Sequence, residues 1–265
     1  MLVAIKLHTM IIKFYLIYFG LILSCFNYPV KITHHKIDNL IFENSVFAIV
    51  KISYNHIGET PVEGGICGTA FLLNDSTVIT ANHVLNRGNF IPNSGYKFVQ
   101  YWLLKRNAKK IIQLKKENLT SLPNIELTLI SLDKKIEPGY KITYQKPQIG
   151  DLVYNFGHIS NMPVTSAHWE NELVIDDYTL ENSKSDKVGK ILSIKKCTVH
   201  SADLEIVDKL FIQPSFVANV GMSGGLLISE NRLIGLMSFG LPSDSIIKKE
   251  VYAISINEIL EALKR

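Results

Sequence analysis

Hydrophobic residues occur along this chain in short runs that are bounded by Gly, Asn, Asp or Pro. The runs are rich in Val, Ile, Leu, Phe and Tyr, a composition typical of β-strands. The clearest runs are Ser45–Tyr54, Gly65–Asn74, Ser76–Ala81, Ile125–Leu132, Asp151–Ile159, Gly225–Ser229 and Arg232–Gly240. Because no amphipathic helix separates them, the pattern predicts an all-β barrel or sandwich and not a βαβ fold.

A helical pattern is clear only at the end of the chain. Ser255 and Glu258 have the spacing of a capping box, and "INEILEALKR" (Ile256–Arg265) places its apolar residues on one helical face. The sequence therefore predicts a terminal α-helix that begins at Ser255.

The first 25 residues have the pattern of a secretory signal. Lys6 and Lys13 precede or border the uncharged run Phe14–Cys25, which is shorter than the ~20 apolar residues of a spanning helix. Its ending, Ile22–Cys25, resembles a bacterial lipoprotein cleavage box with Cys25 as the lipid-bearing residue. Ordinary cleavage nearby and an uncleaved membrane anchor are the alternatives. In each case we expect the rest of the chain to be extracytoplasmic: secreted, periplasmic or anchored by its N-terminus.

Composition and charge narrow the class of protein. A chain of 265 residues with 47% hydrophobic and 20% charged residues is typical of a folded globular protein. Without Lys6 and Lys13 the net charge of +4 falls by two, to +2, which gives no reason to expect a nucleic-acid partner. We interpret the lysine-rich stretch Lys105–Lys116 as a solvated hairpin, with a polyanion-binding patch as the alternative.

The cysteines indicate no metal site. Besides Cys25 the chain has Cys67 and Cys197, whose spacing fits no metal-binding pattern. We expect two buried free thiols, although a disulfide in an oxidising compartment stays open. No metal or cofactor is expected.

Three glycines surround one serine in "ANVGMSGGLL" (Ala218–Leu227). A catalytic serine needs a base and a group that orients the base. In the nucleophile elbow of α/β-hydrolases the histidine follows the serine, but no histidine follows Ser223 here. The base must therefore lie upstream; the candidates are His34, His35, His56, His83, His158, His168 and His200.

His83 stands directly after a predicted strand, in "STVITANHVL". Here the chain resembles the trypsin/chymotrypsin superfamily, in its bacterial branch of Deg-type and related extracytoplasmic proteases. The family pattern "TAxHV" is matched by Thr80–Val84, and "GICGTAFLLND" just upstream resembles its "GSGFhh" strand. The resemblance implies that His83 is the general base.

The resemblance covers about residues 42 to 262. "IGDLVYNFGH" (Ile149–His158) resembles the opening of the family's second barrel, with His158 where proline is usual. "GMSGGLLISENRLIGLMSFG" resembles the nucleophile loop and the strands after it, and "VYAISINEILEAL" the last strand and helix. The implied fold is all-β: two six-stranded antiparallel barrels, at 40–145 and 146–265, with a C-terminal α-helix. Because the chain ends there, we expect no peptide-binding domain after it.

The acid departs from the family pattern. Glu126 occupies the slot in which the family has aspartate before an apolar run. A glutamate can orient an imidazole, but its extra methylene requires the backbone to retreat by roughly 1.5 Å. Asp133 is the rival, at the far end of the same run.

The resemblance also assigns the oxyanion hole and the primary pocket. The N–H groups of Gly221 and Ser223 would bind the oxyanion. Val217 and Ala218 would form the base of the pocket, and Ser238, Phe239 and Gly240 its wall and the strand that pairs with substrate. With no carboxylate at the base, we expect small or medium aliphatic residues to be accepted, unless these residues are plain core packing.

The sequence thus predicts a serine endopeptidase that cleaves polypeptides through an acyl-enzyme, with His83, Glu126 and Ser223 as its triad. The alternative, motivated by Glu126 and to a lesser degree by Asn82 and His158, is a pseudoprotease that binds a peptide or protein without cleaving it.

Overall fold

The computed structural model of the chain describes residues 45–56, 63–85, 91–92, 95–105, 111–137, 143–160, 168–169, 173–174, 184–201, 204–241 and 250–264. The predicted signal segment 1–25 and Cys25 lie outside them. Within these ranges, no helix combines the length and the apolar character that crossing a bilayer requires.

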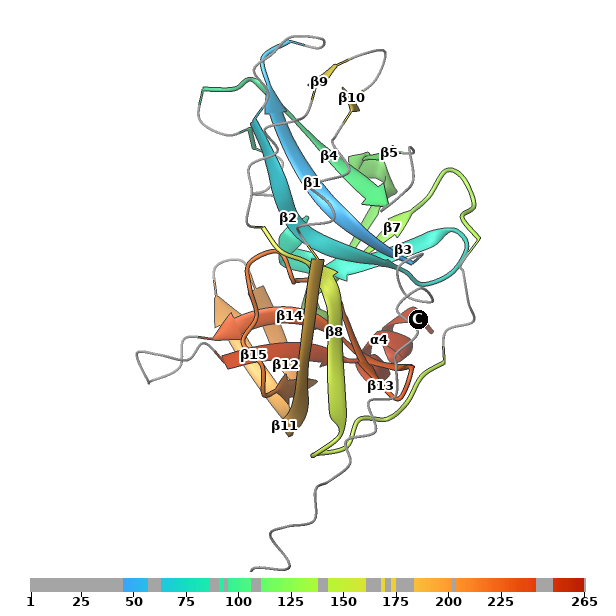
Figure 1. The fold of residues 1–265 in the computed structure, drawn as a ribbon, viewed down its shortest axis with the longest axis vertical. Helices are drawn as coiled ribbons and strands as arrows, with labels where there is room; N and C mark the ends of the chain where they lie inside the picture. Colours follow the sequence, from blue (N-terminus) through green and yellow to red (C-terminus); the bar gives the residue numbers. More distant parts are fainter. Residues whose placement is uncertain are drawn as a thin grey trace, which may run out of the picture. The chain divides into compact units, whose positions relative to one another are not determined.

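The first half of the described chain forms one antiparallel sheet of seven strands, in the order β5-β4-β1-β2-β3-β7-β6 (Figure 1). Its strands are β1 Val46–Tyr54, β2 Glu63–Leu72, β3 Thr77–Ala81, β4 Phe98–Lys105, β5 Ile111–Leu114, β6 Leu119–Leu122 and β7 Leu127–Ser131. Strand β1 is buried along nearly its whole length because it lies between β4 and β2 near the middle of the sheet.

The second half forms a closed antiparallel barrel in the order β11-β12-β15-β14-β13-β8. Its strands are β8 Leu152–His158, β11 Lys184–Ser201, β12 Leu204–Pro214, β13 Leu226–Ser229, β14 Arg232–Leu241 and β15 Glu250–Ser255. The short strands β9 His168–Trp169 and β10 Leu173–Val174 make a separate ribbon.

The predicted all-β fold with two antiparallel sheets and a terminal helix is confirmed. The first sheet differs in detail from a six-stranded barrel. It has seven described strands and makes a half-barrel, because its edge strands β5 and β6 do not pair with each other in the described part of the chain.

The terminal helix α4, Ile256–Leu263, begins as predicted but is capped differently. The Ser255 hydroxyl accepts a hydrogen bond from the Asn257 N–H at 3.4 Å. Glu258 does not complete a capping box: its carboxylate accepts from the Leu210 N–H at 3.0 Å and pairs with Lys209 at 3.4 Å. Lys209 and the backbone of Leu210, both on β12, thus bind the Glu258 carboxylate and attach the helix to the barrel.

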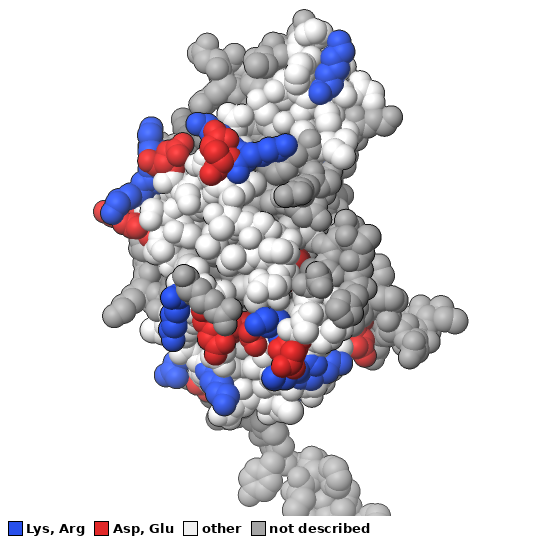
Figure 2. Space-filling view, turned by 180° about the vertical axis from the view of Figure 1, so that it is seen from behind, with Lys and Arg blue, Asp and Glu red and all other residues white. Residues whose placement is uncertain are grey.

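Charged side chains of both signs are interspersed on the face of the molecule that Figure 2 shows. The described chain also has exposed ion pairs, such as Lys196 with Asp208 at 2.7 Å and Lys135 with Asp75 at 2.8 Å. The Lys135 ammonium lowers the pKa of the Asp75 carboxyl by hydrogen bonding to it. Exposed pairs of this kind contribute little to stability.

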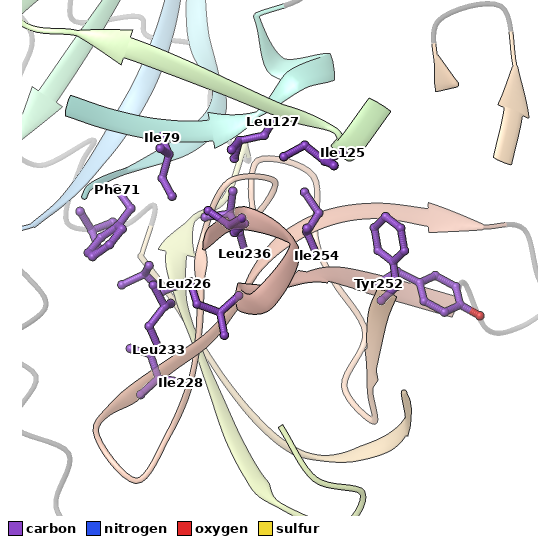
Figure 3. Packing of buried hydrophobic residues seen from close by; sticks show 14 of the residues in the cluster. Phe71, Ile79, Ile125, Leu127, Leu226, Ile228, Leu233, Leu236, Tyr252 and Ile254 are labelled. Atoms are coloured by element: carbon purple, nitrogen blue, oxygen red, sulfur yellow. The ribbon is translucent and has the colours of Figure 1, made fainter. Parts of the chain in front are cut away.

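The two sheets share one hydrophobic core. Ile79, Ile125 and Leu127 of the first half pack with Leu236 and Ile254 of the barrel (Figure 3). All five side chains are at most 2% exposed. The segment just before β7 is therefore held against the second barrel by buried apolar surface.

Both described cysteines are free thiols. Cys67 lies on β2 in the first sheet and Cys197 on β11 in the barrel, and both are half-buried, not fully buried as expected. Burial raises the pKa of the Cys67 thiol to about 12, so it stays protonated at neutral pH and is a poor nucleophile.

Candidate active site

His83 lies in a single turn of 3-10 helix, η1 Asn82–Val84, that follows β3 without a gap. Asn82 and Val84 are buried, whereas the His83 side chain is 37% exposed. The turn packs tightly on β2 because residue 68 is glycine: a Cβ there would lie 2.4 Å from Val84 Cγ1. The turn thus fixes the backbone of His83 while its ring faces the outside.

Glu126 adopts a left-handed backbone conformation, with φ 57° and ψ 40°, between the 3-10 turn η4 (Pro123–Ile125) and β7. This region is uncommon for a residue with a long side chain. Its neighbours Ile125 and Leu127 are buried in the shared core, which holds the turn in place. Backbone strain of this kind persists only where the surrounding structure enforces it, and it is concentrated at functional sites.

The Glu126 side chain is fully buried and contacts His83 twice. Its Oε1 meets the Nδ1 of the His83 ring and also accepts the His83 backbone N–H at 3.1 Å. The left-handed turn therefore accommodates the longer acid in the slot where the family has aspartate. Asp133 lies at the far end of β7, 70% exposed and beside Lys115 at 3.8 Å.

The contact determines what His83 can do. An imidazole that donates its Nδ1–H to a carboxylate presents Nε2 as the basic nitrogen. The second oxygen of Glu126, Oε2, is buried and accepts no hydrogen bond from the described residues. A buried carboxylate oxygen without a partner is costly, so the contacts of the other oxygen, Oε1, with His83 are what hold this side chain in the site.

The loop that carries Ser223, between β12 and β13, is bound to the first sheet by Thr69 on β2. The Thr69 N–H donates to the Ser223 carbonyl at 2.8 Å, and its hydroxyl donates to the Gly221 carbonyl at 3.0 Å. The same hydroxyl accepts the His158 N–H at 2.8 Å. Thr80, three residues before His83, donates to the Thr69 carbonyl at 2.6 Å. These bonds hold the serine loop beside β3, the strand that leads into the turn of His83.

Gly224 makes this close approach feasible. Its φ is +84°, and a Cβ at this position would lie 1.9 Å from the Thr69 carbonyl oxygen and 2.4 Å from Thr80 Oγ1. Glycine is needed both for the backbone conformation and for the space.

The N–H groups of the serine loop fall into two sets. Those of Met222, Gly224 and Gly225 donate to backbone carbonyls at 3.2, 2.7 and 2.9 Å. The N–H groups of Gly221 and Ser223 donate to no acceptor among the described residues. Two free donors from residues i and i+2, one of them on the serine itself, are the arrangement that binds a developing oxyanion.

The Ser223 hydroxyl donates to the backbone carbonyl of Ser238 at 3.0 Å. A hydroxyl has one proton, so in this state it is not directed at His83. Proton transfer to the imidazole requires this hydrogen to leave the Ser238 carbonyl.

The residues assigned to the pocket lie on both sides of this loop. Val217 is 51% exposed, and Ala218 packs against the core of the barrel. Ser238 is buried in β14, at the point where the pairing of β14 with β15 is interrupted between Met237 and Gly240. Phe239 and Gly240 continue β14; their side chains lie outside what the structure describes.

Two residues of the site, Thr69 and Asn82, make contacts that the sequence did not predict. Thr69 joins the serine loop to β2, and the Asn82 side chain accepts hydrogen bonds from β6 and β7. Thr69 lies inside the motif "GICGTAF", but its partner Gly221 is 152 positions away. Such contacts depend on the fold and leave no local pattern.

A family model described as Trypsin matches residues 48–262, which is most of the chain. No curated protein sequence matches it.

Solved protease structures have a similar fold. The HtrA-type protease AlgW with a decapeptide is 17% identical, with a TM-score of 0.57 over 85% of this chain and 65% of that one. The active form of the Rv3671c protease from M. tuberculosis is 16% identical, with a TM-score of 0.56 over 87% and 86%. The chain spans 60% and 64% of the length of two further AlgW chains. At these identities the likeness is one of fold.

Proposed function

The chain belongs to the trypsin family, and from that premise we propose that it is a serine endopeptidase with Ser223 as nucleophile, His83 as base and Glu126 as the group that orients the base. The observation that carries the proposal is the pair of N–H groups at Gly221 and Ser223 that no described residue accepts. They lie in a loop that Thr69 binds to the strand leading into His83. In a turn with only a structural role, buried backbone N–H groups would be expected to have hydrogen-bond partners.

The geometry supports acyl transfer in two stages. The Ser223 hydroxyl rotates off the Ser238 carbonyl, Oγ attacks the substrate carbonyl carbon, and Nε2 of His83 takes the proton. The oxyanion lies between the N–H groups of Gly221 and Ser223, donors of a kind worth about 3–4 kcal/mol each. The imidazolium then protonates the leaving amine, and water releases the acyl group by the reverse steps.

We propose a polypeptide substrate. The solved AlgW structures that resemble this chain hold a tripeptide or a decapeptide. In this chain the interruption between β14 and β15 leaves residues 238 and 239 outside the ladder, and we assign Ser238–Gly240 to pairing with substrate backbone. With Val217 and Ala218 at the pocket and no carboxylate among them, we expect cleavage after small or medium aliphatic residues.

Peptide-library cleavage tests this proposal. Wild-type protein and Ser223→Ala are incubated with a diverse peptide mixture, and the new termini are identified by mass spectrometry. We expect cleavage by the wild type alone, with aliphatic residues enriched before the cut. Equal cleavage by both proteins would assign the activity to a contaminant and contradict the proposal.

A second candidate function is peptide binding without cleavage. The bond from the Ser223 hydroxyl to the Ser238 carbonyl favours it, because a serine held in this rotamer is not activated. In that case the wild type would bind library peptides as tightly as Ser223→Ala does, and neither protein would cut them.

A further inference from the structure

We propose that Asn82 is a positioning residue: it clamps the two strands on either side of Glu126 and thereby holds the carboxylate against His83. The proposal rests on the proposed function, because it concerns how the triad is kept in register. Asn82 directly precedes His83 and belongs to the same turn, η1.

A single oxygen of Asn82 serves both strands of the hairpin that bears Glu126. Asn82 Oδ1 accepts from the Ser121 hydroxyl on β6 at 2.5 Å and from the Thr128 hydroxyl on β7 at 3.0 Å. Ser121 and Thr128 are directly opposite each other in the β6–β7 ladder. The side chain thus joins both strands at the level where they diverge into the turn.

The backbone of Asn82 holds the turn itself. Its N–H donates to the Glu126 carbonyl at 3.0 Å, and the next N–H, that of His83, donates to Glu126 Oε1 at 3.1 Å. The backbone N–H groups of residues 82 and 83 therefore both bind Glu126, while the side-chain oxygen of Asn82 binds residues 121 and 128. Asn82 is 4% and Thr128 2% exposed, so the bond between them is protected from water, whereas Ser121 lies at the surface.

The clamp matters here because the acid is a glutamate. Glu126 reaches His83 from a left-handed backbone that the rest of the turn must enforce, and its side chain has one more rotatable bond than aspartate. A shift of the turn by about 1 Å would separate the carboxylate from the imidazole, and displacements of that size can lower rates by about 10²-fold. Asn82 is the polar side chain placed to prevent that shift.

The test uses pairs of variants that differ in one hydrogen bond. Asn82→Leu keeps the size of the side chain but removes the acceptor. Thr128→Val keeps the shape but removes the donor, and Thr128→Ser keeps the donor. Thr120→Val is the matched control, because Thr120 is exposed on the same strand as Ser121 and lies outside the site.

Two readouts are made on folded protein, with folding checked by circular dichroism. The first is the rate of labelling by a fluorophosphonate, measured over a range of concentrations to separate the maximal rate from the half-saturating concentration. The second is the far-downfield proton resonance of the His83 Nδ1–H in contact with Glu126, which needs no enzyme activity.

We expect Asn82→Leu to lower the maximal labelling rate about 10- to 100-fold with little change in half-saturation, and to broaden or abolish the downfield resonance. Thr128→Val should act in the same direction, whereas Thr128→Ser and Thr120→Val should resemble the wild type. If Asn82→Leu does not fold, the comparison of Thr128→Val with Thr128→Ser decides the matter.

Contrary results are equally definite. Labelling within about twofold of the wild type in folded Asn82→Leu or Thr128→Val, with the resonance intact, overturns the role of Asn82. So does an equal loss in Thr128→Val and Thr128→Ser, which would indicate a general packing defect. If even the wild type is not labelled, the proposed function fails, and the resonance alone then shows whether Asn82 positions Glu126.

Discussion

Glu126 reaches His83 from an unusual backbone conformation. Its left-handed backbone and full burial bring a carboxylate that is one methylene longer than aspartate onto the Nδ1 and the backbone N–H of His83. The retreat of the backbone expected from the sequence is thus achieved by a local conformation and not by a displaced strand. The site is built for glutamate.

Replacing Glu126 by Asp should therefore lower activity. The shorter side chain would leave a gap of about one carbon–carbon bond, roughly 1.5 Å, to the imidazole. We expect a loss of about 10- to 100-fold in fluorophosphonate labelling rate with little loss of stability, because Asp tolerates the left-handed region better than Glu. Labelling followed over time measures the rate, and thermal unfolding measures the stability. An increase in rate would mean that the glutamate limits the enzyme.

Gly224 provides a second test at this scale. Gly224→Ala should destabilise the protein by about 2–5 kcal/mol, since it adds left-handed strain and a clash with Thr69 and Thr80. Gly150→Ala is the control: its φ is +92°, but nothing lies within 4 Å of the added Cβ, so the cost should be about 1–2 kcal/mol. Urea unfolding of the two variants compares them. Equal costs would contradict the proposed close approach.

Strand β2 connects the parts of the site, because its residue Thr69 is hydrogen-bonded to the serine loop, to β3 and to the end of β8. The Thr69 hydroxyl accepts one buried bond and donates another. The relative position of His83 and Ser223 is thereby determined by one strand and not by loops alone.

Thr69→Val removes that hydroxyl while keeping the shape of the side chain. Leaving the Gly221 carbonyl and the His158 N–H without this partner should cost about 1–3 kcal/mol and should slow labelling of Ser223. Thr69→Ser, which retains the hydroxyl, should be close to the wild type in both respects. The prediction fails if the two variants lose labelling equally.

The sequence predicted the strongly apolar strands well and the lysine-rich strands poorly. Runs such as Ser45–Tyr54 and Ser76–Ala81 are strongly apolar and form β1 and β3. The long strands β11 and β12 were not predicted, because they alternate lysines with apolar residues that stay exposed, such as Leu192 at 55%. The run Ile125–Leu132 was predicted to be one strand, but the turn at Glu126 delays β7 to Leu127.

The parts of the candidate site that have a local sequence pattern could be predicted. His83 follows a strand, and Ser223 lies among glycines; both are visible in a few consecutive residues. The contacts of Asn82 with Ser121 and Thr128 span 39 and 46 positions. The Ser223 rotamer depends on Ser238, which the fold brings beside it. Neither has a local signal.

For the molecule as a whole, the shared core couples the two sheets. Leu127 from the first sheet and Leu236 from the barrel belong to one buried cluster, next to the turn that carries Glu126. Because the proposed triad has members in both halves, loss of this packing should affect stability and reactivity together.

Leu127→Ala should destabilise the protein by about 2–5 kcal/mol, while Leu192→Ala, the same substitution at an exposed position, should change stability by less than about 0.5 kcal/mol.

Denaturant unfolding followed by fluorescence and by circular dichroism should give one coincident transition for the described two-sheet unit. Two separate transitions would show that the halves fold independently.

Intact-mass labelling with a fluorophosphonate would show whether His83 activates Ser223. We expect a single adduct on the wild type, mapped to Ser223, absent from Ser223→Ala and formed far more slowly by His83→Ala. An unlabelled wild type in protein shown to be folded, or an adduct that persists in Ser223→Ala, would contradict this expectation.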